Sequence, residues 1–194
     1  MPALTFLFEK RTRSIIHEFS IRLLNLAGES EKHYNTIETV PGPWPIAIKT
    51  LSAKTAGKKV VVYLDAPYKR EEYSRYYHVL ETLISYNYPS AIGKGKIPDK
   101  SKGERFRSEF FTRSENHLTN SLEEVLVSCL KNNWICAWSY SDSGDASIVT
   151  VLNQINEKVS ITTTSFATPY QHKAQGTHSA KEVIEYLVLM VPNG

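Results

Sequence analysis

Apolar residues recur along the first half of the chain with both helical and strand-like spacings. Steps of three and four predict helices over residues 13–27 and 68–86. Alternating or continuous apolar runs predict strands, and these cover residues 4–8, 34–40, 46–51 and 59–65. The unbroken apolar run Val60–Leu64 predicts a central strand that is covered on both faces. Three prolines within residues 41–45 predict a rigid turn, because proline fixes φ and lacks an N–H donor.

The second half of the chain also has apolar residues at both helical and strand-like spacings. Helical stripes predict helices over residues 121–131 and 179–190, and each begins with a Ser-x-x-Glu capping box. Three strands are expected between these helices, over residues 134–140, 146–152 and 158–166. The connections between them are rich in Ser, Asp, Gly and Asn, which is typical of hairpin turns.

The two halves echo each other in order and in sequence. Lys59-Val60 opens a run that leads to Ala66-Pro67-Tyr68, and Lys158-Val159 opens one that leads to Thr168-Pro169-Tyr170. Self-similarity at a long period is typical of repeated units. We therefore predict an α+β fold with two α-β-β-β-α units, a pseudo-duplication in which helices cover one face of largely antiparallel sheet.

The expected domain organisation follows from this echo. Residues 1–93 form a first α+β unit, residues 94–116 a basic flexible linker or loop, and residues 117–194 a second α+β unit. The two units either stand apart or pack as one globular domain, with their sheets joined edge to edge.

Composition places the chain among ordinary globular proteins. It has 194 residues, of which 41% are hydrophobic and 22% charged, and a chain of this length buries enough surface to fold without a disulfide or a metal. Two cysteines are too few for a secreted disulfide scaffold. No apolar run approaches the roughly 20 residues that span a bilayer. We expect a cytoplasmic protein that does not enter a membrane.

Positive charge is concentrated in the middle of the chain. The net charge is +3 overall, with a basic segment at residues 94–113 and an acidic remainder after it. Cations beside aromatic rings suit single-stranded nucleic acid, because the cations neutralise phosphates and the rings stack on bases. The alternative is a solvated linker whose phenylalanines anchor it to the core. The candidate binding residues are Lys94, Lys96, Lys100, Lys102, Arg105, Phe106, Arg107, Phe110, Phe111 and Arg113.

Aromatic side chains alternate along the predicted strand 134–140. Trp134, Cys136, Trp138 and Tyr140 share one face of it. If this face is buried, it is the core beneath the helices. If it is exposed, it is a stacking platform or a protein hot spot, since Trp and Tyr dominate such spots.

Acidic residues offer a different hypothesis, a metal-dependent nuclease. Asp142 and Asp145 lie in one turn and Glu157 precedes Lys158. Nuclease sites bring carboxylates from neighbouring strands together on Mg²⁺. Here the acid and the lysine are adjacent, so they face opposite sides of a strand.

The leading hypothesis is a non-enzymatic binding protein. No histidine has metal-site spacing with a cysteine pair, and no glycine-rich phosphate loop precedes a helix. We expect no cofactor, no metal and no catalytic residue. The partner we expect is another protein, bound in the manner of an inhibitor, immunity or adaptor protein. The alternatives are nucleic-acid binding through residues 94–113 and, after it, a metal-dependent nuclease or other hydrolase.

Overall fold

The computed structural model describes residues 15–31, 38–67, 74–93, 97–103, 108–171 and 182–193. The chain divides into two compact units, Met1–Pro41 and Gly42–Gly194.

The described part of the first unit is mainly one helix, α2 (Ile15–Glu31), which confirms the helix predicted over residues 13–27. Its side chains between Ser20 and Glu29 are exposed. The strand predicted over residues 4–8 lies outside the described residues. The strand predicted over residues 34–40 is wrong at residues 38–40, because no described strand lies alongside to pair with them.

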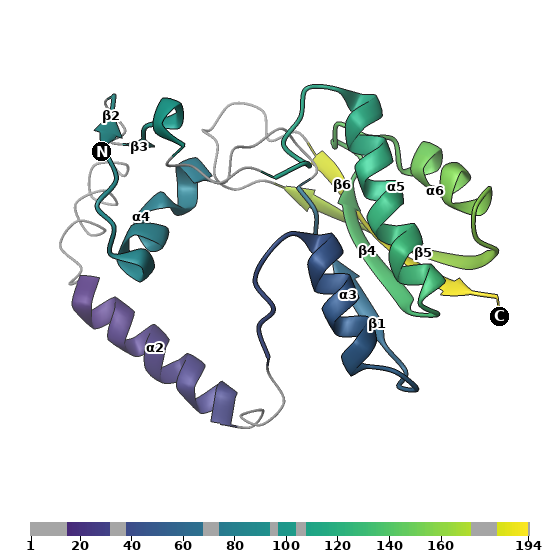
Figure 1. Cartoon of the computed structure of the whole chain (residues 1–194), viewed down its shortest axis with the longest axis horizontal. Coiled ribbons are helices and arrows are strands. Elements are labelled where there is room, and N and C mark those ends of the chain that lie inside the picture. Colours follow the sequence, from purple (N-terminus) through teal and green to yellow (C-terminus); the bar gives the residue numbers. More distant parts are fainter. Residues whose placement is uncertain are drawn as a thin grey trace. The chain divides into compact units, whose positions relative to one another are not determined.

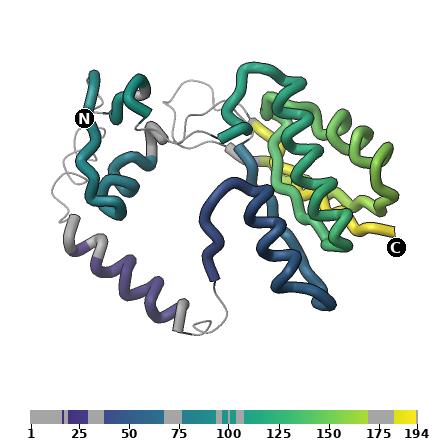
Figure 2. The backbone as a smooth tube through the Cα atoms, in the orientation of Figure 1, coloured from purple at the N-terminus to yellow at the C-terminus, as the bar shows by residue number. Residues whose placement is uncertain are grey.

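The second unit is built on a four-stranded sheet in the order β1–β4–β6–β5 (Figure 1). Its strands are β1 (Val61–Leu64), β4 (Ile135–Ser141), β5 (Ile161–Gln171) and β6 (Glu182–Pro192). β1 runs parallel to β4, whereas β6 is antiparallel to both of its neighbours. Figure 2 shows that β1, which comes early in the chain, lies beside β4, which comes about 70 residues later.

Three helices cover one face of this sheet. They are α3 (Trp44–Lys54), α5 (Glu115–Lys131) and α6 (Ile148–Asn156), and all three lie on the same side of the strands in Figure 1. Ser114 caps α5 by accepting a hydrogen bond from the N–H of His117. Ser147 caps α6 in the same way, with the N–H of Thr150 as donor. Each serine hydroxyl satisfies one of the donors that a helix leaves unpaired at its start.

The core lies between the sheet and these helices. Cys136, Trp138 and Tyr140 alternate on β4 toward α5 and are at most 1% exposed, so the prediction that this strand face is core is confirmed. The buried stripe of α5 packs onto them at helical spacing. Its apolar members are Leu118, Leu122, Val125, Leu126, Cys129 and Leu130.

A smaller group of elements follows β1 in the sequence. It consists of α4 (Ser74–Ser85), β2 (Ala91–Ile92), β3 (Ile97–Pro98) and the short 3-10 helix η1 (Lys100–Lys102). β2 and β3 form an antiparallel two-stranded ladder, and α4 contacts β3. α4 confirms the helix predicted over residues 68–86 where the chain is described.

The predicted α+β class, with helices on one face of a largely antiparallel sheet, is confirmed. Strands from the predicted units 1–93 and 117–194 share one sheet, since β1 pairs with β4. The domain boundaries and the pseudo-duplication stay predictions.

Two predicted strands are helices. Residues 46–51 belong to α3, because Pro45 occupies the first turn of that helix, where its missing N–H and fixed φ favour helix entry. Residues 148–152 belong to α6, and Val151 and Ile155 are both fully buried at a spacing of four. Short apolar runs of this length fit either period.

The helix predicted over residues 179–190 is wrong from residue 182 onward, where the chain forms β6. Its residues Val183, Val188 and Val191 are β-branched, and two neighbouring strands supply hydrogen-bond partners along its length. Residues 179–181, the start of the predicted capping box, lie outside the described residues. Tertiary pairing therefore overrides the local helical stripe.

The prediction that the run Val60–Leu64 is a central strand covered on both faces is wrong. β1 stands at an edge of the sheet and is covered on one face only, with burial alternating along it. None of the helices in the described part of the chain is long and apolar enough to cross a membrane.

Candidate functional site

The face of the sheet that points away from α3, α5 and α6 is called here the open face. Strand alternation and the pairing register define its members. Its members over residues 61–63, 135–139, 162–168 and 185–191 are Val61, Tyr63, Ile135, Ala137, Ser139, Thr162, Thr164, Phe166, Thr168, Glu185, Leu187, Leu189 and Val191. Ser141 and Val183 continue the same alternation at one end of the face but are buried.

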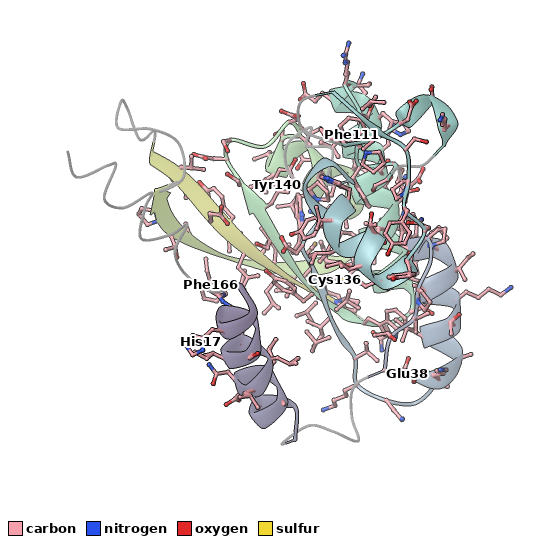
Figure 3. The ribbon with its side chains drawn as sticks, turned by 90° about the vertical axis from the view of Figure 1, so that its left-hand side faces the viewer. His17, Glu38, Phe111, Cys136, Tyr140 and Phe166 are labelled. Atoms are coloured by element: carbon pink, nitrogen blue, oxygen red, sulfur yellow. The ribbon has the colours of Figure 1, made fainter. Side chains whose placement is uncertain are left out.

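Large apolar side chains of the open face are accessible to solvent. Val61 is 65% exposed, Tyr63 63% and Phe166 56%, while Leu187 and Val191 are less exposed. In Figure 3, Phe166 lies on the other side of the strands from Cys136 and Tyr140, which are among the buried side chains. A protein normally buries such side chains, because each one withdrawn from water stabilises by roughly 1.5–3 kcal/mol.

The register makes the apolar side chains continuous across the strands. Tyr63 lies opposite Ala137, which lies opposite Leu189. One step along the strands, Leu187 lies opposite Phe166. Directly opposite residues in a sheet have Cβ atoms about 5 Å apart, so these residues are neighbours and form one patch.

The charge on the open face is low and of one sign. Glu185 is its one charged member, and none of its members is Lys or Arg. Nucleic-acid binding depends on neutralising phosphates with cations. This face therefore suits an apolar protein surface better than a nucleic acid.

A cleft of about 610 Å³ opens on the covered side of the sheet, between the end of β4 and the start of α6. Three acidic side chains line it, Glu115 from α5 and Asp142 and Asp145 from the β4–α6 connection. Burial raises the pKa of the Tyr140 hydroxyl to about 12; the N–H of Ala146 opposes this shift, and Asp145 and Glu115 add to it by repulsion.

The acids of the cleft are not arranged like a metal site. Asp142 Oδ1 accepts the N–H of Ile184 at 3.1 Å, which ties the end of β4 to β6. Glu157 lies at the opposite end of α6 from Asp145, and nine helical residues separate such ends by roughly 13 Å. Among the described residues, no three His, Cys, Asp or Glu side chains are placed to hold a metal ion.

The basic segment is only partly described. Lys94, Lys96, Arg105, Phe106 and Arg107 lie outside the described residues, as does the side chain of Lys100.

Four candidate residues of that segment remain. Lys102 is exposed and donates from Nζ to Ser90 Oγ at 2.9 Å. Arg113 is exposed, and Phe111 is half-buried. Phe110 is half-buried against the core cluster. The anchoring role considered for the phenylalanines fits Phe110, and nucleic-acid binding by the segment stays a prediction.

The two cysteines are free, buried thiols on neighbouring elements, Cys129 on α5 and Cys136 on β4. A hydrogen bond between them lowers the pKa of Cys129 and raises that of Cys136, with burial adding to the rise. Both are nearly inaccessible, which makes them core residues and not nucleophiles.

Comparison of the chain with protein-family models, with curated proteins and with solved structures found no match. The function is therefore inferred from the geometry of the sheet and its surroundings.

Sequence reasoning missed the open face. Val61 and Tyr63 sit in an apolar run that predicted burial on both faces, and Phe166 stood in a strand with no assigned exposure. No local signal marked this face, because Thr163 and Ser165 on the opposite side of β5 are as polar as Thr162 and Thr164.

Proposed function

We propose that this chain is a non-enzymatic binding protein that engages another protein through the open face of its sheet. The observation that carries the proposal is the contiguous apolar patch around Tyr63, Phe166 and Leu187. Soluble proteins seldom expose large apolar side chains in contact with one another unless they are covered by a partner.

The side chains of the patch indicate which kind of protein surface would bind to it. Apolar side chains from four strands form a gently twisted surface, and Thr162, Thr164 and Thr168 add hydroxyl groups along one side. An amphipathic helix or a second sheet with an apolar face complements such a surface. Tyr63 and Phe166 are the expected anchors, because aromatic side chains dominate binding energy at protein interfaces.

The experiment compares a tagged parent chain with two variants in an extract of the native host. Tyr63→Ser and Phe166→Ser each remove an exposed ring without removing a core contact. We expect a co-purifying protein at defined stoichiometry, retained after nuclease treatment, and at least about a tenfold loss of affinity in either variant.

A matched control is Val149→Ser. Val149 is as exposed as Val61, but it lies on α6, on the covered side of the sheet. Its substitution should leave binding unchanged. Binding that survives both ring substitutions would overturn the proposal. So would retention that disappears with nuclease or with neutralisation of the basic residues of segment 94–113, and that outcome would establish nucleic-acid binding instead.

A further inference from the structure

In the described part of the chain, the outer edge of β5 is a long, regular strand edge with no strand paired to it. β5 has 11 residues and stands last in the sheet, with β6 as its one described partner strand. Its register with β6 runs from Ile161 to Gln171 without a bulge, and Thr162 to Pro169 are exposed. Natural sheets usually protect such an edge with lysines, bulges or a very short strand. The opposite edge, β1, has four residues.

The hydrogen bonds at the end of the strand show which backbone groups face outward. The N–H of Asn193 donates to the C=O of Ser160 at 3.0 Å, and this pair continues the β5–β6 register. Residues of an antiparallel strand alternate in the direction of their N–H and C=O groups. The even-numbered residues of β5 therefore point these groups at β6. The odd-numbered residues point them outward, and these are Ile161, Thr163, Ser165, Ala167, Pro169 and Gln171.

Pro169 agrees with this assignment. It belongs to the outward set, where a missing N–H leaves the ladder with β6 intact. The outer edge consequently offers five N–H donors, from Ile161, Thr163, Ser165, Ala167 and Gln171, and six C=O acceptors.

A second copy of the same edge complements this pattern about a two-fold axis at Ser165. Ser165 then lies opposite Ser165 of the second copy, Thr163 opposite Ala167, and Ile161 opposite Pro169. Every pair joins outward-facing residues, so up to about eight main-chain hydrogen bonds form. Pro169 falls at the end of the ladder, where a missing donor matters least.

The side chains allow the same pairing. No residue between Ile161 and Gln171 carries a charge, so no like charges meet across the axis. On the open face Thr164 lies opposite Phe166 and Thr162 opposite Thr168, combinations that are favourable in antiparallel pairs. On the covered side, Val149 and Leu152 line the same cleft as Ser165 and leave apolar surface beside the strand.

We propose that the chain forms a two-fold dimer in which β5 pairs antiparallel with β5 of a second copy, centred on Ser165. The two sheets join into one continuous sheet of eight strands, and the open faces of both copies lie on the same side of it. This inference does not rest on the proposed partner binding, because pairing uses the strand edge and leaves the open face uncovered.

The first test is the mass of the full-length protein in solution over a wide concentration range, by light scattering and sedimentation. We expect about twice the monomer mass of 22.0 kDa. Ser165→Pro removes one outward N–H from each copy while keeping a residue type that the same edge already tolerates at Pro169. It should weaken the dimer about tenfold, because two hydrogen bonds are lost.

The second test fixes the register and does not depend on the proline variant folding. Directly opposite residues have Cα atoms about 5.5 Å apart, within the range of a disulfide. Ser165→Cys should therefore cross-link to itself with oxidised glutathione. Thr163→Cys should not, because the two positions are roughly 13 Å apart, but it should cross-link when mixed with Ala167→Cys. The parent chain, with buried Cys129 and Cys136, is the control.

Three results would overturn the proposal. They are a parent chain that is monomeric at every concentration, a Thr163→Cys variant that cross-links to itself as readily as Ser165→Cys, and a dimer whose mass is unaffected by a folded Ser165→Pro variant. Loss of partner binding in the Tyr63→Ser variant with an intact dimer would leave this inference standing.

Discussion

The hydroxyl oxygen of Tyr140 accepts a hydrogen bond from the backbone N–H of Ala146 at 3.1 Å. This bond closes the connection between β4 and α6, because it holds the last turn before the helix against the end of the strand. Gly144 lies against the same ring, so closely that a Cβ atom there would approach the ring carbons and the hydroxyl to 2.5–2.8 Å. Tyr140 on β4 therefore contacts both the turn at Gly144 and the residue that precedes the cap of α6.

Replacing Tyr140 with Phe should destabilise the protein by about 1–3 kcal/mol, because the buried N–H of Ala146 loses its acceptor. Urea unfolding at neutral pH measures this difference. A cost near zero would mean that another group or a water molecule satisfies this N–H.

The same variant should change the alkaline stability profile. The pKa of Tyr140 is about 12 in the folded protein, against an ordinary value of 10.0. Between these values the unfolded state releases the proton and the folded state keeps it, so stability is full below pH 10 and falls as the pH rises to about 12. The fall attributable to Tyr140 is about 3 kcal/mol. Urea titrations of parent and Tyr140→Phe over this window should converge, and parallel curves would contradict the assignment.

Gly144→Ala should destabilise the protein by about 1–3 kcal/mol through overpacking against the ring of Tyr140. The matched comparison is Gly28→Ala in α2, where a Cβ meets no atom within 4 Å and a helix gains by losing glycine. Thermal unfolding of both variants measures the contrast. The double variant Gly144→Ala with Tyr140→Phe leaves the ring in place, so it should not relieve the clash.

The sequence predicted the elements that carry a single clear period. β4 alternates over seven residues and was predicted within one residue of its observed bounds. α5 carries buried apolar side chains at steps of three and four, and its end was predicted correctly. The start of α5 was misplaced, since Ser121 is buried inside the helix and the cap is Ser114. Ser114 and Ser121 are both followed by polar residues within three positions, so both resemble helix caps in the sequence. Packing of the helix against the sheet determines which serine is the cap.

Segments that fit two periods could not be decided from sequence. Residues 148–152 are apolar and β-branched, which favours a strand, yet Ser147 caps them and Val151 and Ile155 fit a helix. β6 shows the reverse case. Its residues have helical apolar spacing, yet they form a strand that pairs with β4 on one side and β5 on the other. Pairing partners distant in the chain determine both outcomes, and no local pattern contains them.

The open face could not be predicted for a related reason. Which side of a strand is covered depends on where the helices pack, and Val61 and Tyr63 are as apolar as the core residues Val125 and Trp138. The order β1–β4–β6–β5 is what places Val61 and Tyr63 at an edge with one uncovered side. Apolar residues look the same in the sequence whether they pack in the core or lie on the open face.

The serine caps give a prediction about helix starts. Ser147→Ala should destabilise the protein by about 1 kcal/mol, because the N–H of Thr150 loses its acceptor at 3.3 Å. Ser114→Ala should act similarly through the N–H of His117. Ser147→Asp keeps an acceptor and adds favourable charge at the helix start, so it should retain the parent stability. Chemical denaturation of the three variants tests this, and equal losses in Ser147→Ala and Ser147→Asp would exclude capping as the cause.

The ion pair between Lys158 and Glu123 gives the last prediction. Lys158 Nζ lies 2.7 Å from Glu123 Oε2, and the glutamate side chain is 5% exposed while the lysine is half exposed. The hydrogen bond to Glu123 raises the pKa of Lys158, so the stability that the pair contributes is present below the ordinary lysine pKa and is lost as the pH rises through the higher folded value. Lys158→Met should be the least stable variant in urea, because it leaves a buried carboxylate without its cation. Adding Glu123→Gln to it should restore much of the loss, since the amide carries no charge to compensate. If the double variant is less stable than Lys158→Met alone, the carboxylate is held by other donors and the pair is incidental.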